Sequence, residues 1–414
     1  MDNTDQVRLA GRRYRLADLR ADPEAYRDAF TRARSEDQHA VCLCHPAGRK
    51  LVIRRTQSGR HFLARWPGEA HLHATACPFY ESAAEHSGRS AYAHSAIRET
   101  EDGVSIRVDV ALRLAVAAAA ASTTPEASER EARPGRRSAT LLGLVHWLWE
   151  VGRLNSWQPS QPRRMWRDCH AALSDRIAET TVNRQPLSEV LYVVPPFRPE
   201  TADAAAARFE QFLAGLGPQG ETAHRGLVLG EIRAVGHTGR GNIRYDLCHH
   251  RRLLVASQRL HETVRARFAN AYSEAARKAG GRRIGVFAIE RSPGGHAAII
   301  DMAVMLTSPT FVPADSSHEL TMTAALVAGG VAFEKPLRYD ATELVLPDFV
   351  LTDAPVTTVV EVWGREDPEY LARKAAKQAH YRDRGTAVIE WSVGEPLPDL
   401  RRLGRWSSPA PHRS

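Results

Sequence analysis

The sequence lacks long apolar runs and a recognisable secretory signal. Its apolar stretches fall well short of the ~20 residues that a membrane-spanning helix needs, so we expect neither a membrane span nor a membrane partner. Residues 1–6 contain no basic segment followed by an apolar one, which predicts that there is no secretory leader. These absences predict a protein of the cytoplasm.

Cysteine is also scarce, since the 414 residues contain five, an odd number. Three of them, Cys42, Cys44 and Cys77, lie close together in the N-terminal part. This count and grouping argue against a disulfide framework of the kind found in small secreted proteins. A metal site in a reducing cytoplasm explains the grouping better.

Acidic residues are outnumbered, because 56 Lys and Arg oppose 48 Asp and Glu and give a net charge of +8. Arginine supplies most of the positive charge, and its planar guanidinium suits phosphate contacts. The hydrophobic fraction of 43% and the charged fraction of 25% are those of a globular protein. The charge fits a nucleic-acid partner, DNA first, without requiring one.

Residues 1–113 are expected to form a β-rich module similar to a zinc ribbon. Asp22-Pro23-Glu24 offers an N-cap, a proline at N1 and an acid in the first turn, so a helix is predicted to about residue 34. Apolar residues alternate over 104–112, which predicts a half-buried strand that closes the module. The other predicted strands cover 40–44, 51–55 and 62–66.

Two short motifs in this module carry metal-ligand chemistry. One is Cys-Leu-Cys, and the other is His-x3-Cys, whose spacing suits two ligands on one turn. Together they predict a closed structural zinc site. The competing interpretation is a pair of small buried thiols with a surface histidine, and His71 and His45 are alternative histidines. The predicted zinc ligands are Cys42, Cys44, His73 and Cys77.

Residues 114–140 are rich in Ala and then in Ser, Thr, Glu, Arg and Pro, which predicts a flexible linker. The middle region, 141–308, is expected to combine helices with antiparallel β-structure. Apolar spacing predicts helices around 141–148 and 165–177 with a turn between them, which is a helix-turn-helix arrangement. The candidate nucleic-acid contacts at the second helix are Arg163, Arg164 and Arg167. An ordinary helix pair with a solvated arginine face is the alternative.

The rest of the middle region is expected to consist of a helix at 202–216, a long helix at about 262–279 and two hairpins. The hairpins join 227–235 to 243–247 and 284–289 to 297–305. Cys248-His249-His250 has no second ligand pair at suitable spacing, so no metal site is predicted there. Cys169 falls in the apolar period of its helix and is expected to pack in the core.

Residues 309–414 are expected to form a separate domain with the element order α-β-β-β-α-β, a mixed sheet flanked by helices. A helix follows the Ser316 cap, a strand covers about 331–339, and a second helix starts at Asp367-Pro368 and ends near Gly385. A strand at 386–391 closes the order. The whole chain is therefore predicted to be an α+β multidomain protein.

Asp348 and Glu361 are the most informative residues of this domain. Each lies in an apolar strand, where packing alone would favour another valine, and a buried carboxylate is costly unless a cation or partner satisfies it. Two carboxylates on neighbouring strands can share a divalent cation. The competing interpretation is an acid in a turn at a strand end and an acid in an ion pair.

Pro347-Asp348, a gap, and then Glu361-Val362-Trp363 inside α-β-β-β-α-β resemble the PD-(D/E)XK, or restriction-endonuclease-like, nuclease superfamily over roughly the last hundred residues. The resemblance implies that Asp348 and Glu361 bind Mg²⁺ or Mn²⁺ with help from the Val362 carbonyl. It also implies that Glu319, on the preceding helix, matches the superfamily's first acidic position.

Trp363 occupies the position of the superfamily's lysine, which is a departure from the pattern. Some members place the basic residue on the next helix, where Tyr370, Lys374, Lys377 and Tyr381 share one face. Nuclease domains fused to helicases look similar in the Glu-x-Trp-Gly wording. The resemblance therefore favours Lys377 as the catalytic lysine, with Lys374 second; a solvated basic face is the alternative.

The first half resembles an uncharacterised bacterial family, in its Cys-x-Cys and His-x3-Cys motifs and in Leu-Leu-Gly-Leu-Val-His-Trp-Leu-Trp, and that family brings no known activity. The function expected from all these features is a metal-dependent nuclease that hydrolyses DNA phosphodiester bonds, in defence or mobile-element biology. One alternative is a DNA-binding protein that keeps the nuclease fold and does not cleave. A zinc-stabilised interaction scaffold is the third.

Overall fold

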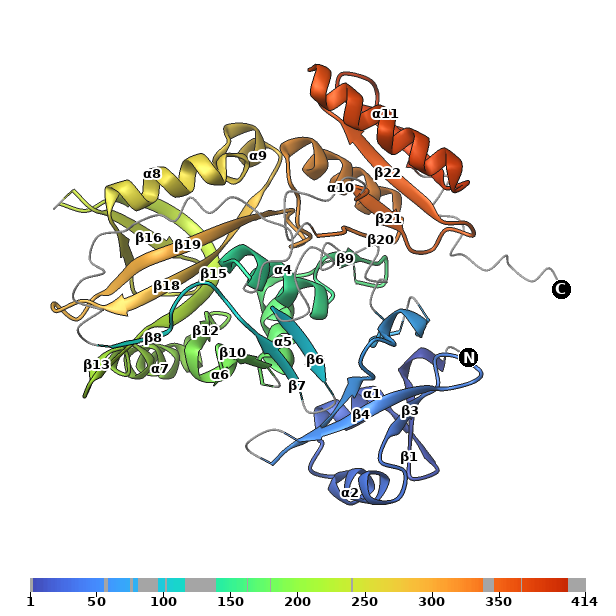
Figure 1. The fold of residues 1–414 in the computed structure, drawn as a ribbon, viewed down its shortest axis with the longest axis horizontal. Helices are drawn as coiled ribbons and strands as arrows, with labels where there is room; N and C mark the ends of the chain where they lie inside the picture. Colours follow the sequence, from blue (N-terminus) through green and yellow to red (C-terminus); the bar gives the residue numbers. More distant parts are fainter. Residues whose placement is uncertain are drawn as a thin grey trace.

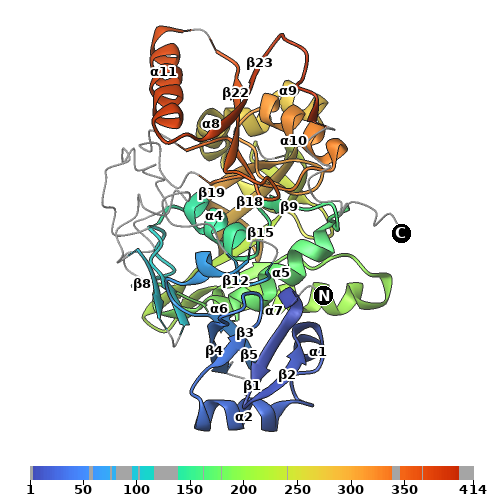
Figure 2. The ribbon, with the colours of Figure 1, turned by 90° about the vertical axis from the view of Figure 1, so that its right-hand side faces the viewer.

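The computed structural model describes residues 3–55, 59–74, 77–80, 96–100, 103–115, 139–161, 163–178, 180–239, 241–337, 346–365 and 367–400. Most of the predicted linker, 114–140, lies outside these residues. Figure 2 shows an N-terminal module and a C-terminal unit at opposite ends, with the middle region between them. In the described part of the chain, no helix has the length and apolarity to cross a membrane.

The N-terminal module is a five-stranded antiparallel sheet with two helices. Its strand order is β2-β1-β3-β4-β5, and one face packs with the helices around Val7, Leu9 and Phe30. The strands are β1 (Gln6–Leu9), β2 (Arg12–Arg15), β3 (Ala40–Cys42), β4 (Arg49–Arg55) and β5 (His61–Arg65), and the helices are α1 (Leu16–Ala21) and α2 (Arg27–Glu36). The predicted hairpin is present, whereas the predicted helix begins at Arg27 rather than after an Asp22 cap, and the β1–β2 hairpin was not predicted.

The strand expected to close this module belongs to the middle region instead. β7 (Gly103–Ile106) pairs with β6 (Ile97–Thr100) and, in parallel, with β10 (Thr180–Val182). Val104 and Ile106 join the core around α4 (Leu141–Val151). Alternation predicts that one face of a strand is buried but not which core covers it, so the expected boundary near residue 113 is not where the module ends.

Five strands of the middle region close into a ring that surrounds an apolar core. Every pairing is antiparallel except β17–β19, and β15 pairs with both β16 and β18. A register shift between Ile232 and Ala234 bends β15, as a β-bulge does, which lets one long strand serve both neighbours. The strands are β15 (Gly226–His237), β16 (Ile243–Leu247), β17 (Leu254–Ala256), β18 (Arg282–Arg291) and β19 (Ala297–Thr307).

Shorter elements surround this ring. One long helix was predicted at 262–279, but a 3-10 turn at Ala269–Tyr272 interrupts it because Ser273 caps a new helix through the Ala276 N–H. The helices are α5 (Trp166–Ile177), α6 (Leu187–Val190), α7 (Ala202–Ala214), α8 (Gln258–Arg267) and α9 (Glu274–Lys278). The strands are β8 (Arg113–Ala115), β11 (Gln185–Pro186), β12 (Leu191–Val193), β13 (Gly217–Gln219) and β14 (Thr222–His224).

The predicted helix-turn-helix is not an exposed helix pair. Every residue of α4 except Leu142 is buried, and the Trp149 indole N–H donates to the Phe311 carbonyl at 3.0 Å. The turn that precedes α5 contributes β9 (Ser156–Trp157) to the C-terminal sheet. α4 is therefore enclosed, because its apolar residues cover too much of the helix surface for a solvent-facing position. α5 buries one face, which carries Trp166, Cys169, Leu173 and Ile177.

The C-terminal unit has the predicted element order α-β-β-β-α-β. Its sheet has the order β23-β22-β21-β20-β9, so a strand from the middle region crosses the boundary expected near residue 309. The elements are α10 (Ser317–Gly329), β20 (Phe333–Glu334), β21 (Phe349–Leu351), β22 (Thr358–Trp363), α11 (Pro368–Asp383) and β23 (Ala387–Ser392). Figure 1 shows α11 lying along β22. Residues 338–345, which include part of a predicted strand, lie outside the described residues.

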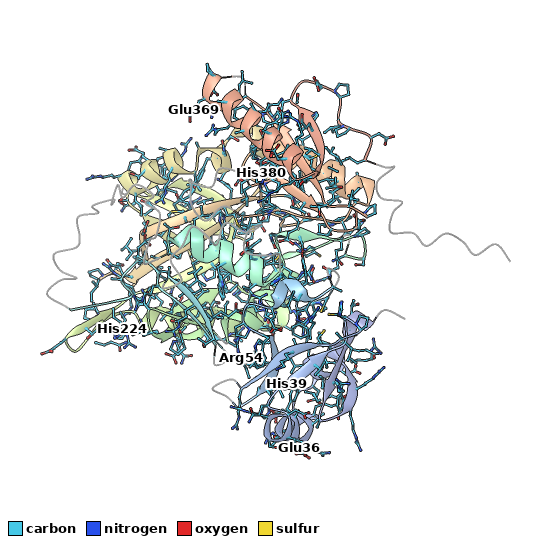
Figure 3. The ribbon with its side chains drawn as sticks, turned by 45° about the vertical axis from the view of Figure 1, so that its right-hand side comes forward. Glu36, His39, Arg54, His224, Glu369 and His380 are labelled. Carbon is cyan, nitrogen blue, oxygen red and sulfur yellow. The ribbon has the colours of Figure 1, made fainter. Side chains whose placement is uncertain are left out.

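Arginine side chains connect the N-terminal module to the middle region. The Arg54 guanidinium donates to the Thr100 carbonyl at 2.6 Å, and Figure 3 shows Arg54 at the border between the two parts. Arg153 donates to the Cys77 carbonyl and lies 5.5 Å from the centre of the Tyr80 ring. Burial lowers the pKa of the Arg153 guanidinium, so this contact desolvates a charge.

Candidate active site and metal centre

The two predicted carboxylates of the C-terminal unit lie opposite each other on adjacent strands. Phe349 pairs with Val360, which sets Asp348 beside Glu361. The Asp348 carboxylate accepts the Val362 N–H at 2.8 Å. Asp348 is 7% exposed and Glu361 is fully buried. The strands therefore hold both acids in the interior, where a carboxylate needs a partner.

Lys377 of α11 supplies that partner. Its ammonium lies 2.9 and 2.8 Å from the two Glu361 oxygens, and the Tyr381 hydroxyl donates to the same carboxylate at 2.5 Å. Lys377 and Tyr381 are one turn apart, so both reach the sheet from one helix face. Asp367 caps the helix through the Tyr370 N–H, and this fixes where the helix starts. The predicted ammonium is thus in contact with the predicted carboxylate.

Opposing effects set the pKa of Glu361. Burial raises the pKa of the Glu361 carboxyl to about 7, the nearby Asp348 charge adds to the rise, and Lys377 opposes it. The effect of Asp348 on this pKa means that the two carboxylates repel each other. A cation placed between them would relieve that repulsion.

Glu319 of α10 forms a second buried ion pair, with a lysine that the sequence analysis did not select. The Lys335 ammonium lies 2.9 Å from Glu319 and 3.0 Å from Asp315, and Lys335 is 1% exposed. Burial raises the pKa of the Glu319 carboxyl to about 7, against the lowering effect of Lys335. The charges of Asp315 and Asp348 raise the pKa of Glu319 further, so Glu319 interacts electrostatically with the site that contains Asp348 and Glu361. A lysine within the apolar run 331–337 was the available signal.

Replacing Lys335 by methionine is expected to destabilise the C-terminal unit strongly. The change leaves Glu319 as a buried, unpaired acid, which costs about 3–5 kcal/mol in the free energy of unfolding. The double variant Lys335→Met/Glu319→Gln should recover much of that loss, because the charge without a partner is gone. Urea unfolding followed by tryptophan fluorescence measures both. A double variant no more stable than the single one would contradict the pairing.

Trp363, which occupies the lysine position of the motif, lies beside two lysines of α11. The Lys374 ammonium is 4.9 Å from the centre of the Trp363 ring and the Lys377 ammonium is 5.8 Å from it. Lys374 therefore contacts the aromatic ring, and no ion pair or hydrogen bond joins it to a carboxylate of the described residues. The Tyr370 hydroxyl donates to the Val362 carbonyl at 3.3 Å, which is the carbonyl that the resemblance implies as a cation ligand.

The three acids do not form a ready-made cage. In the part of the chain that the structure describes, just one group of three or more Cys, His, Asp or Glu has ligand atoms all within 4.8 Å of one another, and it lies in the N-terminal module. Glu319 and Glu361 each contact a different lysine, Lys335 and Lys377. The charge of Asp348 raises the pKa of both glutamates. The arrangement is two buried lysine–glutamate pairs that flank one aspartate.

The compact group consists of the four predicted zinc ligands. The Cys44 thiol lies 3.3 Å from the His73 Nδ1, and the Cys77 thiol lies 3.6 Å from that nitrogen and 3.5 Å from the Cys42 thiol. Zinc–sulfur bonds of about 2.3 Å in a tetrahedron set sulfur ligands about 3.8 Å apart, so these distances fit one ion. The cluster is Cys42, Cys44, His73 and Cys77.

Strand and turn geometry build this cluster. Cys42 ends β3, Cys44 follows two residues later, and Cys77 follows a short turn after His73. Hydrogen bonding with the Cys77 thiol and burial raise the pKa of the Cys42 thiol to about 12. Without a cation, Cys42 therefore stays protonated at neutral pH. A bound cation reverses this effect because it favours the thiolates. His45 and His71, the alternative histidines, are exposed and outside the cluster.

The predicted nucleic-acid arginines have different surroundings. Arg164 is 9% exposed and donates to the Leu154 and Ser156 carbonyls at 2.7 and 2.5 Å, so it cannot contact a phosphate. The prediction was wrong for this residue because two carbonyls, just before β9 and at its first residue, accept from its guanidinium. Arg163 and Arg167 are exposed. Cys248, His249 and His250 belong to no metal-sized cluster of the described residues.

A family model described as a protein of unknown function, DUF1173, matches residues 14–394. The chain belongs to the DUF1173 family. The match agrees with the expected resemblance to an uncharacterised family, and it extends through both the N-terminal cluster and the carboxylates of the C-terminal unit. No curated protein and no solved structure matches the chain. Any function for this DUF1173 protein therefore has to be argued from its own residues.

Proposed function

We propose that this protein is a metal-dependent nuclease that hydrolyses DNA phosphodiester bonds at the C-terminal unit. The observation that carries the proposal is the contact of Lys377 with Glu361, which faces Asp348 across two adjacent strands. Two carboxylates and an ammonium from a following helix are the elements that the PD-(D/E)XK resemblance implies. A purely structural ion pair would not require the second buried acid beside it, since that acid raises the pKa of Glu361.

The donor set suits Mg²⁺ or Mn²⁺, because it consists of carboxylate oxygens and a backbone carbonyl. Asp348, Glu361 and the Val362 carbonyl would hold the cation. When bound, such a cation acts as a Lewis acid and lowers the pKa of a coordinated water. The repulsion between Asp348 and Glu361 supports a cation at this position, as does the burial of both acids.

The side chains around the acids have separate roles in this proposal. Lys377 would orient the attacking water or neutralise charge that develops on the phosphoryl oxygens. Tyr381 holds Glu361 in place through its 2.5 Å hydrogen bond. Lys335 keeps Glu319 in position beside the site through the 2.9 Å ion pair. Trp363 packs against Lys374 and Lys377, which restricts the positions of both ammonium groups.

The rest of the chain supports DNA as the partner. The net charge of +8 favours a polyanion. Arg163 and Arg167 are exposed, and they follow β9, the strand that joins the C-terminal sheet, closely in the sequence. The middle region closes five strands into a barrel, an architecture that in OB-type barrels binds oligonucleotides. This last support is an analogy of fold, and fold alone does not determine function. The zinc cluster would stabilise the N-terminal module rather than take part in hydrolysis, because four ligands leave no open position.

A catalytically inactive DNA-binding protein is the second candidate. It is favoured by the saturation of Glu361, whose two oxygens already accept from Lys377 and Tyr381. It is also favoured by Trp363 in the motif's lysine position. Incubating the protein with supercoiled and linear DNA and Mg²⁺ or Mn²⁺ separates the candidates. Cleavage supports the nuclease, and retardation in a gel without cleavage supports the binding protein. The absence of both cleavage and retardation supports an interaction scaffold.

Binding of Mn²⁺ to the C-terminal unit is expected to depend on pH. The pKa of Glu361 is raised to about 7, so half of the carboxyls carry a proton at that pH, and the cation must displace it. The affinity should therefore rise about tenfold between pH 6 and pH 8 and change little above that range. Isothermal titration of the zinc-loaded protein measures it. An affinity that is flat over the range would show that Glu361 is already ionised or is not a ligand.

A further inference from the structure

The face of the N-terminal sheet opposite its two helices carries an aligned row of positive side chains, and the middle region covers part of this face at Arg54. Arg13 pairs with Arg8 across β2 and β1, Arg8 pairs with Val41 of β3, and Val41 pairs with Lys50 of β4. The Lys50 ammonium lies 5.4 Å from the centre of the Trp66 ring, just beyond β5. We call Arg13, Arg8, Val41, Lys50 and Trp66 the basic row. It crosses the whole sheet at right angles to the strands.

Side-chain alternation places the basic row away from the core. Val7, Leu9 and Cys42, the neighbours of Arg8 and Val41 along the chain, point to the opposite face and are buried with α1 and α2. Arg8, Arg13 and Lys50 are exposed, and Val41 and Trp66 are half-buried. The candidate zinc cluster lies behind the row, because Cys42 follows Val41 directly. The three cations of the row therefore face the solvent.

The charges of the row are not balanced by the sheet itself. The five strands contain nine Arg or Lys residues and no Asp or Glu. Arg8 and Arg13 are direct cross-strand neighbours, and like charges in that position are destabilising. Neither has an acid within ion-pair distance among the described residues. Arg15, beside the row, has only Asp5 at 3.8 Å, an exposed pair.

We propose that the basic row binds the phosphate backbone of a nucleic acid. Steps of about 4.8 Å between strands spread the cations from Arg13 to Lys50 over about 14 Å, so the row suits a linear polyanion better than a single small anion. An anion there would relieve the repulsion between Arg8 and Arg13. The two apolar side chains of the row, Val41 and Trp66, are half-buried, whereas a membrane-binding face needs apolar side chains that are free to insert. Backbone contacts of this kind give affinity without sequence preference.

This inference rests on the proposed nucleic-acid partner but not on cleavage, and the test keeps the two apart. The full chain carrying Asp348→Ala is mixed, without divalent cation, with a fluorescent random-sequence DNA duplex, and anisotropy is recorded at several salt concentrations. The test variant adds Arg8→Gln and Arg13→Gln. The control adds Arg32→Gln and Arg34→Gln, which removes the same charge from exposed positions of α2 in the same module.

The test variant should bind on the order of tenfold more weakly at low salt, and its log–log salt slope should be shallower by about two, since two phosphate contacts are lost. The control should change less than twofold. Equal losses of DNA affinity in both variants would show that diffuse electrostatic attraction, rather than the basic row, binds the DNA. Binding of the starting protein to vesicles of anionic lipid but not to DNA would overturn the inference. Unchanged zinc content and thermal unfolding in both variants establish that the module is intact.

Discussion

Replacing Asp348 by alanine is expected to reduce the proposed cation-dependent cleavage of DNA on the order of 10²-fold or more in rate. The reason is geometric as well as electrostatic. Asp348 faces Glu361 from the adjacent strand and accepts the Val362 N–H at 2.8 Å, so its loss removes a ligand and frees the backbone of β22. Conversion of supercoiled plasmid to nicked and linear forms with Mg²⁺ or Mn²⁺ measures the rate.

Glu390→Gln is the matched control for this experiment. Glu390 pairs in register with Glu361 on β23 but is exposed and contacts Gln378, so its loss should leave cleavage unchanged. Equal activity of Asp348→Ala and the starting protein would locate any nuclease activity elsewhere. Activity absent from the starting protein, together with tight DNA binding, would select the inactive DNA-binding protein.

The two lysines of α11 allow a second discrimination within the same assay. Lys377→Met should reduce cleavage about as strongly as Asp348→Ala, because Lys377 contacts both Glu361 oxygens. Lys374→Met should have a small effect, because Lys374 contacts the Trp363 ring. A larger loss for Lys374 than for Lys377 would reverse the assignment of the catalytic lysine.

Removing two of the predicted zinc ligands is the second change with a large expected effect. The double variant Cys42→Ser/Cys44→Ser should lose the metal and unfold the N-terminal module, since zinc binding in small modules contributes about 10–16 kcal/mol of apparent free energy. The middle region should remain folded, because its core is built from other residues. Limited proteolysis with mass spectrometry should show rapid digestion of the first 80 residues only.

Cys248→Ser provides the control, because Cys248 is half-buried and lies outside the cluster. It should retain one equivalent of zinc by elemental analysis and the proteolysis pattern of the starting protein. Starting protein that is purified without any metal would leave the competing interpretation, in which Cys42 and Cys77 are small buried thiols. Stable folding of the double variant would support the same conclusion.

Local features of the fold were largely predictable from the chain. The helix that begins at Pro368 after the Asp367 cap and the strand that contains Glu361 follow from capping residues and apolar runs. The same holds for the hairpins of β15 with β16 and of β18 with β19. Lys335 was missed because its partners lie at the opposite end of α10 in the chain, Asp315 just before the helix and Glu319 in its first turn, and no spacing rule connects them.

Sequence alone determined which residues are candidates for chemistry, through the spacing of Cys-x-Cys and His-x3-Cys, the acids within apolar strands, and the helix period that aligns Lys377 with Tyr381. These are patterns of neighbours, and neighbours are encoded locally. Tertiary structure alone decided which core each element joins, so β7 left the N-terminal module, β9 entered the C-terminal sheet and Arg164 became buried. The physical reason is that burial depends on which apolar surfaces meet, and that choice minimises exposed area over the whole chain rather than within a segment.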